Sequence, residues 1–542
     1  MRFLWLDINS SYSHSSLAFP ALEAQLSQAQ REKIQWEIIS GTINSDTGNL
    51  VADIFFLKPD YIFSTLWLFN SEFTLSLLKR IKSLLPDVKI ILGGPEFLGS
   101  NYDFLLTNKE ITAVFRGEAE ETFPLFVQSV IDSSPDYSLP GFCLTDHNQN
   151  YTDNGEAITN DFPSLIPPEN SRFFRFDKPF VQIETSRGCF NTCSFCVSGS
   201  KCSKVQYLDA GTVNKRLEYL ASKGIKDVRI LDRTFNANER HAISLLDVFS
   251  GFAGKMTFHL EIHPALIRDN LKRTLESLPA GLLHVEAGIQ SLNDTVLSLA
   301  GRAGSSEASL EGLRFLISLG LFEVHADLIA GLPSYTYKSL IEDYITLARC
   351  SPAEIQTELL KVLPGTLFKS DALKLNLKYS PVPPYEVLQS DSVKPGEMLK
   401  AARLSKISDI WYNDKRWTSC FRKLITENDK FLLLFIDFTD SVNLSSAAPQ
   451  RAGSILFDFC NKYYPELSVQ VSHAWISAGL PLNSKVAGNV KKWEKGFTGK
   501  NCPFSDLTHD NSYYYLDINE NTAWYSFLNK RKNYPPESII IN

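Results

Sequence analysis

The chain has 542 residues, of which 44% are hydrophobic and 12% aromatic, so it is long enough for two or three domains with separate cores. Its formal net charge of -7 gives no broad basic surface, which argues against nucleic acid as a partner. Nine cysteines at this length exclude a disulfide scaffold, and their odd number favours a reducing compartment such as the cytoplasm.

The N-terminus lacks the basic flank, long apolar core and cleavage site of a signal peptide. No apolar run reaches the roughly 18 to 20 residues that cross a bilayer. The best run, 431–438, has the length of a buried core segment. We therefore expect a cytoplasmic protein without a membrane span.

Residues 1 to 135 alternate short apolar runs with amphipathic, helix-like stretches. The runs predicted as strands are 2–8, 35–40, 61–66, 89–92 and 112–116. Strands that are apolar throughout are typical of a parallel sheet covered on both faces. The fold predicted for this region is α/β, with a doubly wound, flavodoxin-like sheet and a ligand site at the carboxyl ends of its strands.

The pattern weakens from residue 136 to 180, where Ser, Pro, Asn and Asp predict a linker with a small hairpin at 141–152. A second alternating series occupies residues 181 to 385. Its predicted strands are 181–184, 228–231, 257–262, 284–289, 323–329 and 354–362. Six such units predict an open, partial (β/α)6 relative of the TIM barrel, with functional residues at its C-terminal rim.

Residues 386 to 542 are less regular and predict a mixed α+β region that covers the substrate site or serves as an accessory domain. Helices are expected at 401–412, 421–426 and 454–464, and a pair of strands near 513–516 and 523–527. No chemical motif stands out in this region.

Three cysteines are closely spaced directly after the strand predicted at 181–184, in the segment Cys189-Phe-Asn-Thr-Cys193-Ser-Phe-Cys196. Thiolates this close together can wrap one iron-sulfur cluster. A four-iron cluster with three protein ligands leaves one iron open to bind a cofactor or substrate. Such a cluster would be catalytic and not only structural.

Other interpretations of the cysteines stay open. Cys202 is close enough to complete a four-cysteine zinc site, and the thiols could also be an inert apolar group. The remaining cysteines are scattered, and most are expected to be buried thiols: Cys143, Cys350, Cys420, Cys460 and Cys502.

The cysteine spacing and its place after a first strand resemble the radical S-adenosylmethionine superfamily, over roughly residues 180 to 385. The resemblance implies that the open iron binds the amino and carboxylate groups of S-adenosylmethionine. One electron from the four-iron four-sulfur cluster then cleaves that cofactor to methionine and a 5'-deoxyadenosyl radical.

The resemblance also implies which strand-end residues contact S-adenosylmethionine. By position they are Phe195, Asp232, Thr234, Glu261, Glu286, Gln290 and Asp327. Two departures from the family pattern stand out. The usual Gly-Gly-Glu after the second strand is absent, and Tyr335 lies near where a glutamate is common. Arg233, His263 and Tyr385 are candidates, by position alone, for a residue that transfers a proton or a hydrogen atom.

A flavodoxin-like domain before such a barrel resembles the cobalamin-dependent branch of the superfamily. The residues that would contact cobalamin are Thr65, Gly93, Gly94, Gly117 and Glu118, with Trp67 near the cobalt. Glycines at strand ends allow close backbone approach to a bulky ligand, although ordinary tight turns explain them equally well. The Asp-x-His-x-x-Gly signature of other cobalamin proteins is absent, and His14 lies in the first loop without those neighbours.

Together these features predict a cobalamin-dependent radical S-adenosylmethionine methyltransferase that acts on an unactivated carbon or on phosphorus. The resemblance implies a small-molecule or peptide substrate and an electron donor such as flavodoxin or ferredoxin. Two alternatives remain. One is radical chemistry without methyl transfer, such as ring contraction, cyclisation or C–C bond formation, and the other is a non-catalytic binding protein stabilised by zinc or a cluster.

Overall fold

The computed structural model describes residues 1–146, 148–198, 204–428, 430–445, 447–494, 500–504, 511–518, 520–528 and 535–541. They fall into two compact units. The first consists of residues 1–324, 331–335 and 359–395. The second consists of residues 325–330, 336–358 and 396–542. Neither unit is one continuous stretch of chain, and each is described by itself.

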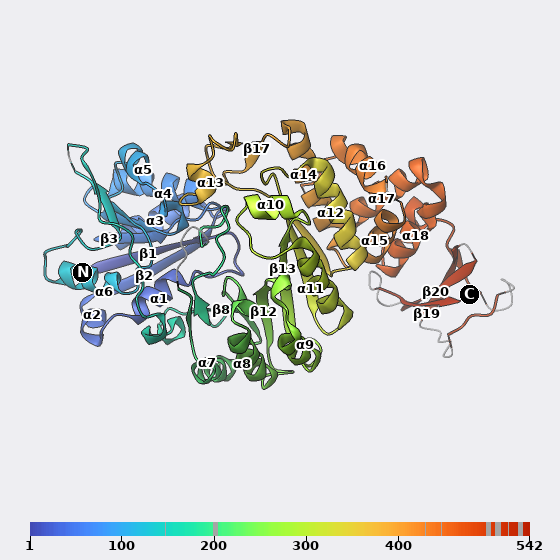
Figure 1. Ribbon diagram of the computed structural model, residues 1–542, viewed down its shortest axis with the longest axis horizontal. Coiled ribbons are helices and arrows are strands. Elements are labelled where there is room, and N and C mark those ends of the chain that lie inside the picture. Colours follow the sequence, from blue (N-terminus) through green and yellow to red (C-terminus); the bar gives the residue numbers. More distant parts are fainter. Residues whose placement is uncertain are drawn as a thin grey trace. The chain divides into compact units, whose positions relative to one another are not determined.

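The first unit begins with a parallel sheet whose strands follow the order β2-β1-β3-β4-β5 (Figure 1). The strands are β1 (Arg2–Asn9), β2 (Gln35–Thr42), β3 (Tyr61–Thr65), β4 (Lys89–Gly93) and β5 (Ala113–Phe115). Their bounds lie within two residues of those predicted. This order is the flavodoxin-like one, so the predicted fold class is confirmed.

Alternate residues of these strands form two different cores, because successive side chains of a strand point to opposite faces of the sheet. One face is mainly aliphatic and includes Leu4, Leu6 and Ile62. The other face is aromatic and includes Trp5 and Phe63. The covering helices are α1 (Ala18–Ala24), α2 (Gln28–Lys33), α3 (Thr47–Leu57), α4 (Ser71–Leu84), α5 (Tyr102–Thr107) and α6 (Thr122–Ile131).

The hairpin predicted in the linker is present and extends this sheet. Its strands are β6 (Phe142–Thr145) and β7 (Tyr151–Asp153), and β6 pairs antiparallel with β5. Phe142 packs edge-on against Phe115, with ring centroids 5.3 Å apart, which anchors the hairpin to the aromatic core. The N-terminal sheet therefore continues to residue 153.

The second series begins in the first unit with four parallel strands, hydrogen-bonded in the order β8-β11-β12-β13. They are β8 (Val181–Ile183), β11 (Asp227–Ile230), β12 (Thr257–Ile262) and β13 (Leu283–Gln290). The helices between and after them are α7 (Ala210–Ser222), α8 (Glu239–Ser250), α9 (Asp269–Glu276), α10 (Asp294–Leu299) and α11 (Ser306–Ser318). Phe258 of β12 stacks on Phe249 of α8 at 4.2 Å, so the apolar face of this sheet packs on the helices.

The second unit contains most of β14 (Glu323–Ala330), with α12 (Tyr337–Cys350) and β15 (Glu354–Leu359), which complete the alternation of six strands. After them come α14 (Pro395–Ile407), α15 (Thr418–Glu427), α16 (Phe431–Phe438), α17 (Pro449–Tyr463) and α18 (Ser468–Ser477). The antiparallel strands β18 (Lys491–Lys492), β19 (Asn511–Ile518), β20 (Asn521–Leu528) and β21 (Glu537–Ile541) complete the unit. The region after residue 395 is thus mixed α+β, as predicted.

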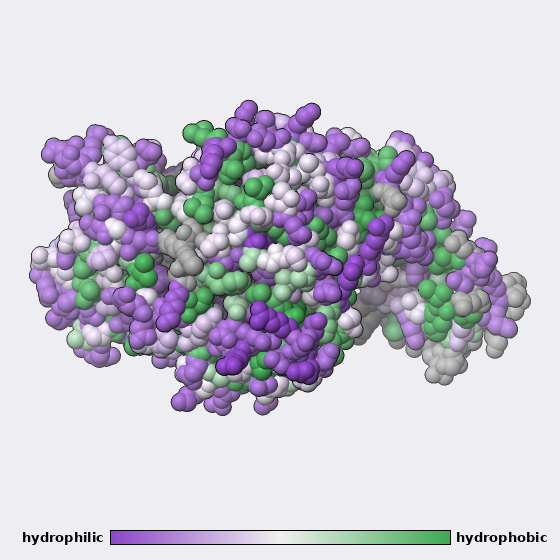
Figure 2. All heavy atoms as spheres, in the orientation of Figure 1, coloured by the Kyte–Doolittle hydropathy of each residue, from purple (hydrophilic) through white to green (hydrophobic). Residues whose placement is uncertain are grey.

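The apolar run at 431–438 forms the core helix α16, in which Phe431, Leu432, Phe435 and Ile436 are fully buried. None of the helices described is long and apolar enough to cross a membrane. Figure 2 shows hydrophilic residues over most of the face in view, with apolar residues in small separate areas.

Candidate active site

The cysteine loop follows β8 and the two-residue strand β9 (Ser186–Arg187), as the sequence predicts. Cys189 and Cys193 are buried and Cys196 is partly exposed. Burial, with smaller contributions from the neighbouring Cys196 and Cys189, raises the pKa of the Cys193 thiol to about 11. The three sulfurs therefore lie close enough to act on one another. Cys202, the fourth thiol of the zinc alternative, lies outside the described residues.

The segment after α10 holds this loop in place. The Ser194 amide donates a hydrogen bond to the Ala300 carbonyl at 2.8 Å. Gly301 has φ +66°, and a Cβ at this position would lie 2.6 Å from the Thr192 carbonyl oxygen. Only glycine fits a positive φ with so close a backbone contact.

Polar side chains surround the thiols. Arg302 lowers the pKa of Cys193 against the effect of burial, and it also donates to the Gly288 carbonyl. The Thr234 hydroxyl lies 4.0 Å from the Cys189 sulfur. Cationic and hydrogen-bonding neighbours favour the thiolate form, which is the form that binds iron.

The carboxylate of Asp232 is bound by the protein itself. Its carboxylate is 1% exposed and accepts four hydrogen bonds, from the amides and hydroxyls of Thr185 and Ser186, at 2.5 to 2.9 Å. Both of its oxygens are thus used by the protein. Asp232 therefore fixes the end of β8 directly before the cysteine loop.

Glu261 and Glu286 are register partners on β12 and β13, so their side chains lie next to each other on the polar face of the sheet. Burial by the surrounding protein raises the pKa of Glu261 to about 7. Arg233 opposes this shift, while Glu286 and Asp232 add to it. A carboxyl group with this pKa exchanges protons near neutral pH, which is unusual for glutamate.

The other predicted contacts to S-adenosylmethionine lie near the cysteines or in the second unit. Gln290 has φ +70° at the end of β13. Its side-chain amide nitrogen, Nε2, lies 2.9 Å from the position that a Cβ of Gly288 would take. Phe195 is partly buried, with its ring centroid 6.5 Å from that of Phe368. Asp327 is partly buried on β14, in the second unit.

The glycines of the N-terminal sheet are required by the backbone. Gly94 follows β4 with φ +106°, and a Cβ there would lie 2.6 Å from the Leu66 carbonyl oxygen. Gly117 follows β5 with φ +101°, and its Cβ would lie 2.1 Å from the Ala157 carbonyl oxygen. Both turns are therefore closed to any residue with a side chain.

One cavity of about 600 Å³ connects these loops with the barrel. From the N-terminal sheet it is lined by predicted cobalamin contacts, namely Thr65, Gly93, Gly94, Gly117 and Glu118, and by Trp67. From the barrel it is lined by Gly188, next to Cys189, by Val197, next to Cys196, and by Arg233. In the described part of the chain, Phe195, Asp232, Thr234, Glu261, Glu286 and Gln290 do not line it.

The cavity extends over the aromatic face of the sheet, which the sequence did not reveal as part of a site. Its apolar floor consists of Trp5, Phe63, Phe115, Phe123, Phe126 and Phe142. A pocket with an apolar floor and a few polar groups is typical of a cofactor site.

Arg187 was also missed by sequence reasoning. Its guanidinium contacts Glu184 at 2.5 Å and Glu120 at 2.9 Å, and it lies 3.7 Å from Glu118. Burial alone would lower the pKa of Arg187, but the carboxylates outweigh it and raise the pKa. This ion cluster ties the residue before the Gly188-Cys189 loop to the loop after β5.

A second contact joins the end of the barrel series to the loop after β4. The Tyr385 hydroxyl donates to the Glu96 carboxylate at 2.6 Å, although the two residues are 289 positions apart. Burial raises the pKa of Glu96. His263, another candidate by position, is 3% exposed, and burial lowers its pKa to about 4, so its ring is neutral near pH 7.

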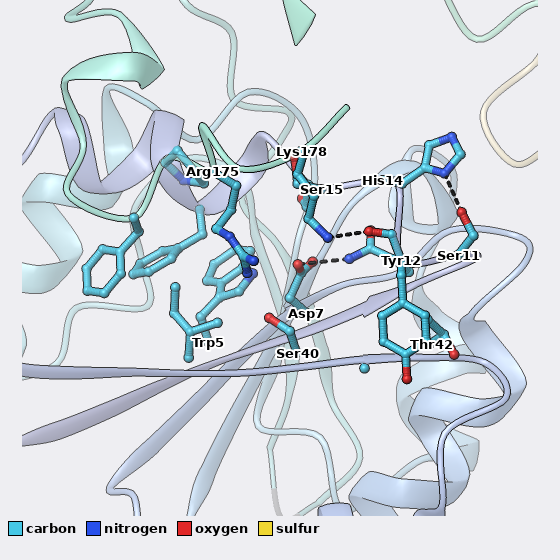
Figure 3. A pocket seen from close by; sticks show the side chains of 17 residues that line it. Trp5, Asp7, Ser11, Tyr12, His14, Ser15, Ser40, Thr42, Arg175 and Lys178 are labelled. Atoms are coloured by element: carbon cyan, nitrogen blue, oxygen red, sulfur yellow. Dashed lines mark hydrogen bonds between the residues drawn. The ribbon is translucent and has the colours of Figure 1, made fainter. Parts of the chain in front are cut away.

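A smaller pocket of about 250 Å³ lies over the ends of β1 and β2 (Figure 3). Asp7 there accepts a hydrogen bond from Asn9 at 2.9 Å, and Lys178 is directed at the backbone of Tyr12. His14 lies in this pocket, 2.8 Å from the Ser11 hydroxyl, and is not part of the lining of the larger cavity. In the described structure His14 therefore does not face a ligand bound in the large cavity.

The donor set fits the cofactors that the sequence predicts. Three thiols on one loop, with hydrogen-bond donors and a cation around them, suit a cluster with three protein ligands. Glycine-bounded strand ends above an aromatic floor suit a large ligand with an apolar base. In the first unit the glycine loops and the residues next to Cys189 and Cys196 line the same cavity.

Comparison with known proteins agrees with this geometry. The family described as Radical SAM superfamily matches residues 183–346, and a protein family of unknown function matches residues 374–465. A protein of Pyrococcus horikoshii named uncharacterized methyltransferase PH0819 is 24% identical over 412 residues, which are 70% of this chain and 86% of that protein. The cobalamin-dependent radical SAM methyltransferase TokK of Streptomyces tokunonensis is 20% identical over 52% of this chain and 44% of its own.

Solved structures with the same architecture include the radical S-adenosylmethionine methyltransferase TsrM from Kitasatospora setae. It has a TM-score of 0.57 and 16% identity, over 73% of this chain and 81% of its own. The cobalamin-dependent S-adenosylmethionine radical enzyme OxsB has a TM-score of 0.60 and 14% identity, over 85% and 75%. These likenesses confirm the fold. The matched domain and the cysteine loop show that the chain contains a radical S-adenosylmethionine domain and is an enzyme with S-adenosylmethionine and a four-iron four-sulfur cluster as its cofactors.

Proposed function

We propose that this enzyme is a cobalamin-dependent methyltransferase that methylates an unactivated carbon, or phosphorus, of a small molecule or peptide. The observation that carries the proposal is the single cavity lined both by the glycine loops of the N-terminal sheet and by residues next to Cys189 and Cys196. A methyl carrier and a radical generator have to reach one substrate, so their sites must share a space. The names of TokK and TsrM as methyltransferases support the same function.

When bound, the cluster and S-adenosylmethionine supply a 5'-deoxyadenosyl radical that abstracts a substrate hydrogen, and cobalamin supplies the methyl group. Cys189, Cys193 and Cys196 would hold the cluster. Gly93, Gly94, Gly117 and Glu118 would hold the corrin side chains, and the aromatic floor would receive the nucleotide base.

The protein's own part is to place these groups and to exclude water. Thr65 ends β3, Trp67 lies two residues after it, and both line the cavity, where they would contact cobalamin. The Trp67 ring lies nearly parallel to that of Phe69, with a 14° interplanar angle and centroids 6.4 Å apart. Neither ring offers a ligand nitrogen, and Trp67 would hold cobalamin by apolar contact. We infer that the enzyme works in the reducing cytoplasm, where flavodoxin or ferredoxin can supply the electron.

The test is anaerobic reconstitution with iron, sulfide and hydroxocobalamin, followed by turnover with S-adenosylmethionine that carries an isotopic label in its methyl group. Candidate small molecules and peptides serve as substrates, and flavodoxin with its reductase serves as the electron donor. We expect corrinoid absorption that survives gel filtration, formation of 5'-deoxyadenosine, and one labelled methyl group per product.

The matched control is the variant with Cys189→Ser, Cys193→Ser and Cys196→Ser, which should keep the corrinoid and lose 5'-deoxyadenosine. Formation of 5'-deoxyadenosine with no label in any product would sink the methyltransferase and leave ring contraction, cyclisation or C–C bond formation. Zinc bound to the cysteines, with no cluster after reconstitution, would support the non-catalytic alternative.

A further inference from the structure

The smaller pocket, at the ends of β1 and β2, has no part in the proposed function (Figure 3). Its volume is about 250 Å³, which is below the roughly 300 to 1,000 Å³ of pockets that hold drug-sized ligands. Among the described residues, the linings of this pocket and of the large cavity share only Trp5. The pocket therefore suits a molecule smaller than a cofactor, bound apart from the cysteine loop.

The pocket changes from apolar to polar along its two strands. β1 and β2 are parallel, and Trp5 pairs with Ile38 while Asp7 pairs with Ser40. Residues two apart on a strand point to the same face, so all four side chains lie on one side of the sheet. Phe19 of α1 stacks on Trp5, with ring centroids 4.9 Å apart, and completes the apolar end. A ligand that fills the pocket thus needs one apolar and one polar end.

Asp7 is the carboxylate of the polar end, in a strand that is otherwise mainly apolar. The Asn9 side-chain amide donates to its Oδ2 atom at 2.9 Å, and no hydrogen bond from a described residue uses its Oδ1 atom. Burial raises the pKa of Asp7, although this hydrogen bond and the charges of Lys178 and Arg175 oppose the shift. A buried carboxylate costs free energy unless donors or cations compensate it. Oδ1 is therefore suited to a donor group of a ligand.

Two cations extend from the linker toward Asp7, as Figure 3 shows. The Lys178 ammonium donates to the Tyr12 carbonyl and has two further protons to donate. Arg175 binds Asp177 through Nε at 2.7 Å and Nη2 at 2.6 Å, which leaves Nη1 for a further acceptor. In the part of the chain that the structure describes, neither cation makes a direct ion pair with Asp7. Opposite charges thus line one small pocket without touching each other.

This arrangement selects a ligand by its charges. An anion near the two cations would also lie near the Asp7 carboxylate, which repels it, and a cation near Asp7 would meet two like charges. A zwitterion avoids both penalties, because its anionic group can contact Lys178 and Arg175 while its ammonium group contacts Asp7. The apolar end beside Trp5 then receives an uncharged group. An α-amino acid carries these three parts on one carbon atom.

We propose that this pocket binds a free α-amino acid with an apolar side chain. The carboxylate of the amino acid contacts Lys178 and Arg175, its ammonium group contacts Asp7, and its side chain lies against Trp5 and Phe19. No described residue of the pocket is next to the three cysteines, so this amino acid is not the molecule that is methylated. The site is independent of the proposed function and can be tested without turnover.

The test uses the full-length protein after anaerobic reconstitution with iron, sulfide and hydroxocobalamin, with saturating S-adenosylmethionine and no electron donor. S-adenosylmethionine occupies the open iron, which could otherwise bind the amino and carboxylate groups of a free amino acid. L-phenylalanine and L-leucine are the probes, titrated by calorimetry. We expect at least one of them to bind, with one molecule per chain.

Analogues of the probe that binds show whether the pocket reads both charges. For L-phenylalanine they are 3-phenylpropionate, which lacks the ammonium group, and phenethylamine, which lacks the carboxylate. Each should bind about 10-fold more weakly or worse, the usual effect of losing one hydrogen bond between charged groups. Equal affinity for the amino acid and both analogues would overturn the proposal.

Variants show whether the amino acid lies in this pocket. Asp7→Asn keeps the size of the side chain and should weaken the amino acid about 10-fold or more, but not the analogue without an ammonium group. Lys178→Met should weaken the amino acid similarly, but not the analogue without a carboxylate. The matched control is Asp53→Asn, which changes an exposed aspartate of α3 outside the pocket and should leave the affinity unchanged.

Absence of binding by both amino acids would overturn the proposal. Equal affinity of the parent and of a folded Asp7→Asn variant would overturn it too, because the amino acid would then lie elsewhere. Unfolding temperatures without the probe separate lost binding from lost folding. If Asp7→Asn does not fold, Lys178→Met decides in the same way, since this side chain is on the linker and not in the sheet.

Discussion

The two sets of strand ends around the large cavity are built from different kinds of residue. In the N-terminal sheet they are glycines with positive φ, Gly94 and Gly117, above an aromatic floor. In the barrel they are charged side chains, Glu184 and Arg187 after β8 and Arg233 after β11, next to the cysteine loop. The first set can select a ligand by shape and apolar contact, and the second by coordination and charge. Substitutions in the two regions should therefore fail in different ways.

The largest effect is expected in the barrel, from Cys193→Ser. The variant should lose the iron-sulfur cluster after reconstitution, because a hydroxyl does not replace a buried thiolate ligand. It should still retain corrinoid on gel filtration, because no residue of the N-terminal sheet changes. Iron and cobalt contents measure both. Cys420→Ser, which changes a buried thiol of the second unit, is the control and should keep the iron. If Cys193→Ser lost both iron and corrinoid, the two regions would not bind their cofactors independently of each other.

The next effect is expected in the N-terminal sheet, from Gly117→Ala. The added Cβ would lie 2.1 Å from the Ala157 carbonyl oxygen, so the loop that carries Glu118 must move. We expect corrinoid affinity to fall at least 10-fold and the free energy of unfolding to fall by about 3 kcal/mol, with the cluster retained.

Gly155→Ala provides the matched control for this prediction. Gly155 also has a positive φ, +82°, but no atom lies within 4 Å of the position that its Cβ would take. Its substitution should cost only about 1 kcal/mol of backbone strain and leave corrinoid affinity unchanged. Equal effects of the two substitutions would mean that strain, and not the loop position, controls binding.

Arg187→Gln tests the ion cluster that joins the two regions. Removal of the guanidinium leaves Glu120 and Glu184 close together and without their cation, and we expect about 3 kcal/mol loss of unfolding free energy. Arg175→Gln, which removes one half of an exposed pair with Asp177, should cost less than about 1 kcal/mol. Chemical denaturation measures both, and equal costs would show that the Arg187 cluster does not couple the regions.

The smallest effect is a pH dependence of stability due to Glu261. Its pKa is raised from about 4.5 to about 7, so its protonated form stabilises the fold, and this contribution is lost as pH rises through that range. Glu261→Gln should remove the dependence. Because the side chain is exposed to water, we expect the free energy of unfolding to change by only about 1 kcal/mol relative to the parent between pH 5 and pH 8. If the difference in unfolding free energy between Glu261→Gln and the parent is the same at pH 5 and at pH 8, Glu261 behaves as an ordinary surface carboxylate.

The strands and the cysteine loop could be predicted from the sequence because their signals are local. Apolar runs such as 61–66 and 257–262 are set by neighbours along the chain, and the spacing of Cys189, Cys193 and Cys196 fits a short loop around one cluster. The glycines at 94 and 117 could be found but not interpreted, because a tight turn and a ligand-binding turn have the same sequence.

The rest depends on contacts between distant residues, which no local pattern encodes. Arg187 meets Glu118 and Glu120 across 67 to 69 positions of the chain, and Tyr385 meets Glu96 across 289. Asp232 was assigned to a cofactor because it ends a strand, but its four hydrogen-bond donors lie directly after the neighbouring strand β8. A buried carboxylate and a ligand-facing one have the same position in sequence and differ only in their tertiary neighbours.

The chain returns to the first unit at residues 331–335 and 359–395 after it has entered the second. No single break in the backbone can therefore release either unit as one continuous polypeptide. A gene rearrangement that exchanges the C-terminal part cleanly can exchange only the residues after 395, whereas β14, α12 and β15 must be inherited together with the barrel. The interleaved path thus limits which segments evolution can replace as modules and which it must change one residue at a time.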